Sequence, residues 1–427
     1  MIFKAARLPG KVFCMKLLFI LDTVEFPLAP TPALARRAAG LLAQRGHTVH
    51  LLELWDGRTL PPAEPGCESH LLAFGDERRM NEALEFGRAG GTPVPLRLAR
   101  LAAKPDAALA AVRQIALKRP RRLVAARSAI ERLDAAEGFD AAVAVAAPYA
   151  GSFALAEAAV ACTKIDWQMD PYAANASYSA PGAWDRERQL ADAMDKLLVA
   201  PAMARYYAPG APLADFAGRM QVLDFPSLVP PAPAAAAVKS EAGRRRCVFV
   251  GSLYPALRTP HYALELFRAL NDPGWELVFV GGGWDNYPAD LPEACRAVLG
   301  ERLVITGPLP REKAEGYLAG ADVLLSLGND LDNQVPSKLF EYFAAGKPVL
   351  HLAKRADDPC LSYFDRWPLA LCLFESEGTG ADVTARLGRF LAEEGERTLP
   401  FSEAEHLFAE NTPAHAADVL EAAAAGR

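Results

Sequence analysis

Short apolar runs alternate with amphipathic stretches along most of the chain. Residues 17–21 are apolar, residues 33–46 repeat apolar positions at helical spacing, and residues 47–54 are again largely apolar. This order predicts a strand, a helix that ends at Gly46 and a second strand, which together form a βαβ unit. The alternation continues at 139–148, 154–162, 163–169, 186–195 and 196–200. The first half of the chain is therefore predicted to be an α/β domain with a parallel sheet.

A second and more regular series of strands and helices begins at residue 247. Its segments are 247–253, 261–270, 275–283, 291–300, 302–309, 312–320, 321–328, 337–346 and 347–353. Between the two series, Pro230–Gly243 is rich in Pro and Ala and has no periodic large apolar residues, which indicates a linker. The predicted parts are an N-terminal extension 1–14, a first domain 15–229, a linker 230–246, a second domain 247–400 and a C-terminal helical tail 401–427.

Length and composition agree with a two-domain α/β protein. A chain of 427 residues exceeds one ordinary core, and a formal net charge of -6 has the wrong sign for a protein that coats nucleic acid. The seven cysteines contain no C-x-x-C pair, which favours reduced thiols and a cytoplasmic protein. The apolar run at 12–21 is interrupted by Lys16 and is too short for a membrane span.

The net charge hides one basic stretch. Residues 97–132 have helical periodicity and contain ten Lys or Arg residues against Asp106 and Glu131, a net charge of about +8. A solvated helix face is the commonest interpretation of such a stretch. Contact with an anionic membrane surface is the more specific functional interpretation. Nucleic acid is disfavoured because no aromatic residue lies within the stretch.

The segment Leu325–Leu350 has the strongest signal for a binding site. It reads as a buried strand, a polar loop and a helix that opens at Pro336-Ser337-Lys338 and ends at Gly346. Helix N-termini attract anions, and Lys338 adds a positive charge there, while Glu341 follows one turn later on nearly the same face. A local Lys-Glu helix pair explains the same spacing without any ligand.

This arrangement resembles the donor-nucleotide motif of GT-B fold glycosyltransferases of family 4, in which E-x7-E precedes an A-x-G-x-P-V ending. Glu341 takes the place of the second Glu, AAGKPVL supplies the ending, and Asn333 stands where the family has the first Glu. The resemblance implies that Glu341 binds the ribose hydroxyls and that Asn333 lies near the transferred sugar. Asn333 can donate and accept hydrogen bonds but supplies no negative charge.

Further matches precede this motif in the order that the family shows. CVFVGSLYPALRTP resembles the first strand and phosphate clamp of the family's C-terminal domain, with Arg258 where the family has a phosphate-binding Lys and Ser252 where it has an Arg. The resemblance covers nearly all of 247–350, and more loosely 16–229. The donor-binding residues that it implies are Gly251, Ser252, Gly281, Gly283, Thr306, Gly307, Pro308, Gln334, Ser337 and Glu341.

Two carboxylates are the candidates on the acceptor side. Asp170 follows a predicted strand in IDWQMDPYAANASY and would position or deprotonate the acceptor hydroxyl, although a turn or helix-cap role is at least as common. Asp22 follows the first strand, at the end of a parallel sheet where ligands bind. The catalytic candidates are Asp170, Asn333, Arg258 and Lys338.

No metal is expected in the reaction. The tripeptide Asp330-Leu331-Asp332 has the D-x-D pattern of some metal-dependent transferases, but it lies in a loop beside cations that already offset phosphate charge. The seven histidines include no H-E-x-x-H spacing, and His47 and His50 are interpreted as structural.

The resemblance implies a GT-B enzyme with two Rossmann-like parallel-sheet domains that face each other across a cleft, and a C-terminal helix that crosses back to the first domain. The expected reaction is retaining, metal-independent transfer from a UDP- or GDP-sugar to a glycan, lipid-linked or other hydroxyl acceptor, in polysaccharide or glycoconjugate synthesis. The expected location is the cytoplasm or the inner membrane face, through residues 97–132. Two alternatives remain open: a non-hydrolysing nucleotide-sugar epimerase, and a GT-B binding module that has lost transfer.

Overall fold

The computed structural model describes residues 14–24, 29–55, 59–74, 121–175, 181–231, 236–255, 257–288, 291–336 and 338–426. The chain divides into two compact units, which are described separately. Unit 1 comprises Met1–Pro226 and Pro413–Arg427, and unit 2 comprises Ser227–Thr412. The predicted extension, apart from Cys14, and residues 97–120 of the basic stretch lie outside the described residues.

Unit 1 is built on one parallel sheet. In the described residues this sheet is 7-stranded, with the order β3-β2-β1-β4-β5-β6-β7, and every neighbouring pair is parallel. The strands are β1 (Lys16–Val24), β2 (Thr48–Trp55), β3 (Cys67–Ala73), β4 (Ala141–Ala146), β5 (Thr163–Gln168), β6 (Lys196–Val199) and β7 (Met220–Val222). The helices are α1 (Pro30–Gln44), α5 (Arg121–Glu137), α6 (Ala150–Glu157) and α7 (Ala183–Asp192), with 3₁₀ segments η1 (Pro201–Tyr207) and η2 (Ala214–Arg219).

Continuous apolar runs place the central strands of unit 1 inside. All six residues of β4 are buried, as are Leu17–Leu21 of β1, because helices cover both faces of a parallel sheet. Gly46 ends α1 as predicted, with a φ of 93° that suits glycine. The polar edge strand β3 was not predicted, because its sequence CESHLLA has no continuous apolar run and is mostly half-buried or exposed.

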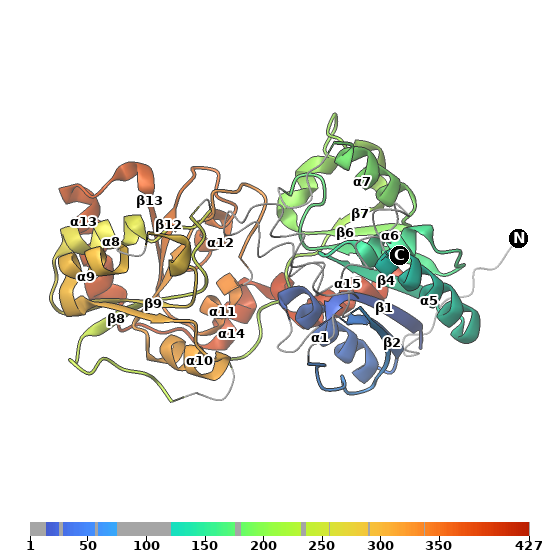
Figure 1. The fold of residues 1–427 in the computed structure, drawn as a ribbon, viewed down its shortest axis with the longest axis horizontal. Coiled ribbons are helices and arrows are strands. Elements are labelled where there is room, and N and C mark those ends of the chain that lie inside the picture. The colour runs from blue at the N-terminus through green and yellow to red at the C-terminus, as the bar shows by residue number, and fades with distance from the viewer. Residues whose placement is uncertain are drawn as a thin grey trace, which may run out of the picture. The chain divides into compact units, whose positions relative to one another are not determined.

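Unit 2 repeats the architecture (Figure 1). Its described sheet is 6-stranded, with the order β10-β9-β8-β11-β12-β13, again all parallel. The strands are β8 (Arg245–Val250), β9 (Trp275–Val280), β10 (Leu303–Gly307), β11 (Val323–Leu327), β12 (Val349–Ala353) and β13 (Ala370–Phe374). The helices are α8 (His261–Leu270), α9 (Leu291–Leu299), α10 (Arg311–Gly320), α11 (Lys338–Ala344), α12 (Leu361–Phe364), α13 (Ala381–Glu394) and α14 (Phe401–Leu407).

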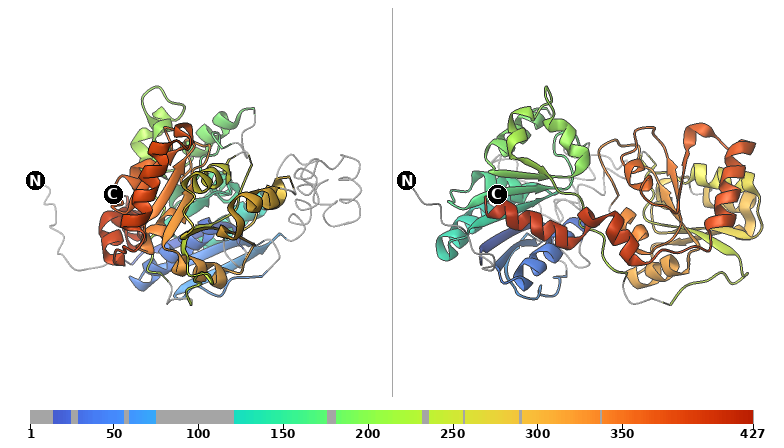
Figure 2. Two further views of the ribbon diagram at one scale, coloured as in Figure 1. Left: turned by 90° about the vertical axis from the view of Figure 1, so that its left-hand side faces the viewer. Right: turned by 180° about the vertical axis from the view of Figure 1, so that it is seen from behind.

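The C-terminal helix α15 (Pro413–Ala424) belongs to unit 1 although it follows unit 2 in the chain. It packs against α1, as Figure 2 shows for the red and blue helices. Arg45, just after α1, forms ion pairs with Asp418 at 2.7 Å and with Glu421 at 3.2 Å. The predicted return of the C-terminal helix to the first domain is therefore confirmed, and so is the fold of two Rossmann-like parallel sheets.

The predicted linker 230–246 falls within unit 2 in this division of the chain. Its described part contacts α10 and β8: the Val238 amide donates to the Gly316 carbonyl of α10 at 2.9 Å, and Arg246 Nη1 of β8 donates to the Val238 carbonyl at 2.6 Å. Among the described residues, no helix combines the length and apolar character needed to cross a membrane.

Candidate functional site

The carboxyl ends of β8, β9 and β10 carry the predicted glycines, and backbone hydrogen bonds bring their loops together. The Gly251 amide donates to the Val280 carbonyl at 2.9 Å, and the Gly281 amide donates to the Gly307 carbonyl at 3.1 Å. A Cβ on Gly281 would lie 1.9 Å from the Gly251 oxygen, and one on Gly283 would lie 2.1 Å from the Leu253 oxygen. These two glycines thus let neighbouring loops touch at the end of the sheet where ligands bind in such folds.

The other predicted residues of these loops lie beside the glycines. Ser252 and Thr306 are half-buried and Pro308 is exposed. The Thr306 hydroxyl donates to the Gly307 carbonyl at 2.8 Å, which orients the turn after β10.

Arg258 lies in a tightly paired turn after β8. Tyr254 and Arg258 exchange backbone hydrogen bonds of 2.9 and 2.7 Å, and Arg258 Nε donates to Asn329 Oδ1 at 3.0 Å. Burial lowers the pKa of the Arg258 guanidinium, while Tyr342 and other neighbours raise it. A guanidinium that is partly out of water and fixed by a rigid turn is prepared to receive an anion.

Lys338 extends toward the end of β8. Its Nζ donates to the Val250 carbonyl at 3.3 Å. Partial burial lowers the pKa of the Lys338 ammonium, and Arg258 and Arg311 lower it further, while Glu341 raises it. Three cations from separate segments of the chain therefore repel one another here, and a bound anion would relieve that repulsion.

Arg311, at the start of α10, is a member of this group that the sequence analysis missed. Its Nε donates to Glu315 at 2.8 Å, which raises the pKa of Arg311, and the Glu341 charge raises it too. The signal that could have found Arg311 is its place in PLPREK, directly after the loop that contains the donor-binding candidates Thr306, Gly307 and Pro308. We call Arg258, Arg311 and Lys338 the cation cluster.

Glu341 is exposed on α11, one turn after Lys338. The next residue, Tyr342, is buried, and its hydroxyl accepts a hydrogen bond of 3.1 Å from the Val250 amide. This contact fixes α11 to the end of β8, so that Glu341 and the cation cluster stay in one neighbourhood. Tyr342 is a second site residue that the sequence analysis missed, because its burial hides its role in an ordinary apolar pattern.

The loop before α11 holds the remaining predicted donor residues. Asn333 is buried, with 8% of its surface exposed, and Gln334 is half-buried. Asp330 of the D-x-D tripeptide forms an ion pair with Arg355 at 3.6 Å. Ser337 lies outside the described residues.

The two acceptor candidates occupy separate surroundings in unit 1. Asp22, at the end of β1, is buried and forms a salt bridge with Arg122 of α5. Asp170 follows β5; its backbone carbonyl accepts a hydrogen bond from the Tyr149 hydroxyl, and burial raises the pKa of its carboxyl group. Asp22 is thus engaged by a cation, while Asp170 is the carboxylate whose surroundings favour holding a proton.

The described end of the basic stretch is partly neutralised. Besides the pair of Arg122 with Asp22, Arg127 lies 3.9 Å from Glu131 and 3.6 Å from Glu157. The count of ten basic residues therefore overstates the positive charge that this stretch presents to a surface.

Residues 244–356 match a known protein family, described as Glycosyl transferases group 1. This range contains β8 to β12, the glycine loops and the whole cation cluster. No curated protein sequence matches the chain.

Solved structures with the same fold match almost the whole chain. The lipopolysaccharide outer core galactosyltransferase WaaB in its apo form is 13% identical with a TM-score of 0.54, covering 96% of this chain and 99% of that one. Sucrose-phosphate synthase from Thermosynechococcus elongatus is 15% identical with a TM-score of 0.59, covering 95% and 97%. HepE from Anabaena in complex with UDP-glucose is 12% identical with a TM-score of 0.58, covering 96% and 100%.

The fold of the chain is therefore that of the GT-B proteins, with two Rossmann-like units. Within that fold, residues 244–356 of unit 2 match the group 1 glycosyl transferases.

Proposed function

We propose that the protein transfers a sugar from a nucleoside diphosphate sugar to a hydroxyl acceptor with retention of configuration. The observation that carries the proposal is the cation cluster, which gathers three positive side chains at the strand ends of unit 2 within the family match. A diphosphate leaving group develops negative charge as the glycosidic bond breaks, and fixed cations stabilise that charge.

In this proposal, different residues of unit 2 contact different parts of the donor. Arg258 and Lys338 contact the diphosphate, Glu341 accepts hydrogen bonds from the ribose hydroxyls, and Asn333 and Gln334 contact the sugar. The loops at Gly251–Ser252, Gly281–Gly283 and Thr306–Pro308 enclose the nucleotide. UDP is the first donor base to test, because HepE is a same-fold protein solved with UDP-glucose, and GDP is the second.

The proposed chemistry proceeds without a metal ion. The cation cluster supplies the charge that a divalent cation would otherwise supply, and Asp330 of the D-x-D tripeptide is paired with Arg355. The proposed acceptor base is Asp170, since burial raises the pKa of this carboxyl group toward the range useful in general base catalysis.

The acceptor is proposed to be a glycan or a lipid-linked hydroxyl compound of cell-surface polysaccharide or glycoconjugate synthesis. The basic stretch 97–132 supports a peripheral position at the inner membrane face, where such acceptors are held.

The test is incubation of the protein with a panel of UDP- and GDP-sugars, with and without acceptor glycans and lipid-linked acceptors. The proposal predicts that free nucleoside diphosphate appears in proportion to glycosylated product, and that NMR of the product shows the anomeric configuration of the donor. An epimerase would interconvert donor sugars with no acceptor present. A binding module, which Asn333 in place of the family's first Glu favours, would bind nucleotide and release none from any donor.

A further inference from the structure

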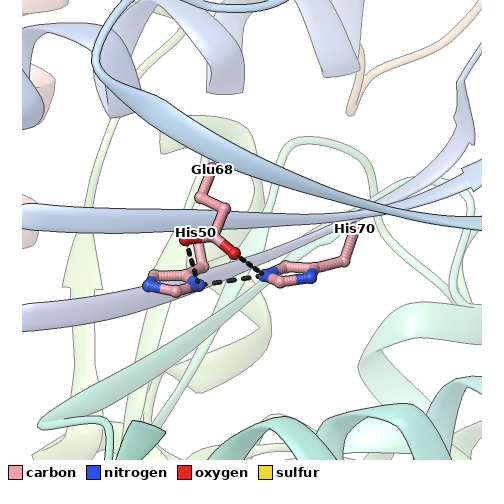
Figure 3. A group of neighbouring side chains, drawn as sticks. All are labelled: His50, Glu68 and His70. Atoms are coloured by element: carbon pink, nitrogen blue, oxygen red, sulfur yellow. Dashed lines mark hydrogen bonds and ion pairs between the residues drawn. The ribbon is translucent and has the colours of Figure 1, made fainter.

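Unit 1 carries a second group of polar side chains, on the edge of its sheet and apart from the donor-side and acceptor-side candidates. His50 comes from β2, and Glu68 and His70 come from the edge strand β3. Glu68 and His70 share one face of β3 because they are two residues apart, and the strand register sets His50 beside Glu68. Figure 3 shows the three side chains converging from the two strands.

The potential ligand atoms lie at the spacing of a metal site. His50 Nδ1 is 2.9 Å from His70 Nε2, Glu68 Oε1 is 3.7 Å from His70 Nε2, and Glu68 Oε2 is 4.0 Å from His50 Nδ1. Two ligands of a tetrahedral Zn²⁺, each about 2.0–2.2 Å from the ion, are about 3.3–3.6 Å apart. To bind the ion, the two imidazole nitrogens must therefore move slightly apart, and the Glu68 carboxylate must move closer to both. Small side-chain rotations achieve these changes.

We propose that His50, Glu68 and His70 form a binding site for a divalent transition metal ion of the Zn²⁺ class. Two imidazole nitrogens and one carboxylate suit Zn²⁺, whereas Mg²⁺ and Ca²⁺ prefer ligand sets made of oxygen. Three protein ligands leave a fourth position for water. The bound ion joins β3 to β2 and so secures the edge of the sheet; it takes no part in sugar transfer.

The exposure of the three side chains suits a metal site that an ion can enter from solvent. The His50 side chain is 2% exposed and the Glu68 side chain 65% exposed. The Phe139 ring packs edge-on against His50, with ring centroids 5.1 Å apart, and holds its orientation. One ligand is thus fixed in place, and the carboxylate is free to swing onto an ion that arrives from solvent.

A direct hydrogen bond between the two imidazoles is the competing explanation. The nitrogens are 2.9 Å apart and the ring planes differ by 7°, a geometry that one shared proton also satisfies. In that case Glu68 has no essential role, and Zn²⁺ has no reason to prefer this place. The two explanations therefore differ in the effect of changing Glu68.

The experiment is isothermal titration of the metal-stripped full-length protein with Zn²⁺, and separately with Co²⁺ while visible absorption is recorded. The variants are Glu68→Gln, His70→Ala and His70→Cys, and His406→Ala is the control because it removes an exposed imidazole from unit 2. Circular dichroism and thermal unfolding show that each variant is folded before it is titrated.

The site predicts that the wild type and His406→Ala bind one more equivalent of Zn²⁺ than His70→Ala, with the intense absorption of tetrahedral Co²⁺. Glu68→Gln should bind that equivalent at least about tenfold more weakly, and His70→Cys should restore binding because a thiolate replaces the lost ligand. Equal stoichiometry and affinity in the wild type, Glu68→Gln and His70→Ala would overturn the proposal. Donor binding and transfer do not enter this test, so it stands or falls separately from the proposed function.

Discussion

Arg258 and Lys338 show how single side chains acquire unusual electrostatics in unit 2. Each is partly removed from water, which lowers its pKa, and the charges of Arg258 and Arg311 lower the pKa of Lys338 further. Both were predicted from the spacing of the helix motif and from the strand before it. Arg311 and Asn329 were not predicted, because these residues reach the same place from other loops and have no motif of their own.

The lowered pKa of Lys338 predicts a pH dependence for nucleotide binding. In the proposed site the protonated ammonium binds the diphosphate, so affinity should fall as the pH rises through the pKa of Lys338, and this pKa lies below the value of about 10.4 for an ordinary lysine. Calorimetry between neutral and alkaline pH measures the fall. The matched variant Lys338→Arg keeps its charge over this range and should show a nearly flat profile; an equally steep fall in that variant would assign the titration to another group.

The unit 1 candidates were harder to interpret from sequence. Asp22 was selected for its place after the first strand, but its partner Arg122 is 100 positions away in sequence and only folding brings the two together. His50 was interpreted as structural, and its neighbours Glu68 and His70 lie on a strand that the hydrophobic pattern did not predict. Pairings between strands are set by the register of the sheet, which no linear spacing shows.

At the scale of elements, the strand and helix alternation was predictable because each central strand is a continuous apolar run. Trp275–Val280 of β9 is buried throughout and was predicted from that property alone. The edge strands β3 and β13 are only partly buried, so their sequences lack such a run. The predicted end of α11 at Gly346 also depends on a close contact of Gly346 with Leu399.

Gly346 connects the end of α11 to a distant segment. Its φ is 69°, a Cβ there would lie 1.9 Å from the Leu399 oxygen, and its own carbonyl accepts a hydrogen bond of 2.7 Å from the Leu399 amide. Gly346→Ala should therefore lower the free energy of unfolding by more than the roughly 1–2 kcal/mol that a left-handed conformation alone costs. Urea unfolding measures this loss.

The control for this variant is Gly300→Ala. Gly300 has a φ of 61° with no heavy atom within 4 Å of a built Cβ, so it should show the conformational cost alone. Equal losses in the two variants would show that the contact with Leu399 is not what requires glycine at position 346.

At the scale of the whole molecule, the chain passes from unit 1 to unit 2 and returns through α15. The helix buries Ala416, Ala417 and Leu420 in unit 1, where α1 buries Ala35 and Ala38. Small side chains on both helices allow close approach, so the stability of unit 1 depends on the last residues of the chain. This return was predictable only through the family resemblance, because the Ala-rich sequence of α15 does not reveal its partner.

Leu420→Ala tests that dependence. Leu420 is 1% exposed, and its truncation should cost about 2–5 kcal/mol of unfolding free energy. Asp418→Ala, on the same helix, removes a side chain that is 65% exposed and should cost less than about 1 kcal/mol. Thermal unfolding measures both, and similar losses in the two variants would contradict the packing of α15 on unit 1.

The central claim is that the cation cluster binds the diphosphate of a nucleotide sugar. Isothermal titration with UDP and with GDP measures it most directly, in the wild type, Arg258→Ala, Lys338→Ala and the control Lys313→Ala, which removes an exposed lysine from α10. The account predicts saturable binding of one nucleotide to the wild type and to Lys313→Ala, and an affinity about 10- to 100-fold weaker in each of the other two variants. Unchanged affinity in both Arg258→Ala and Lys338→Ala would contradict it.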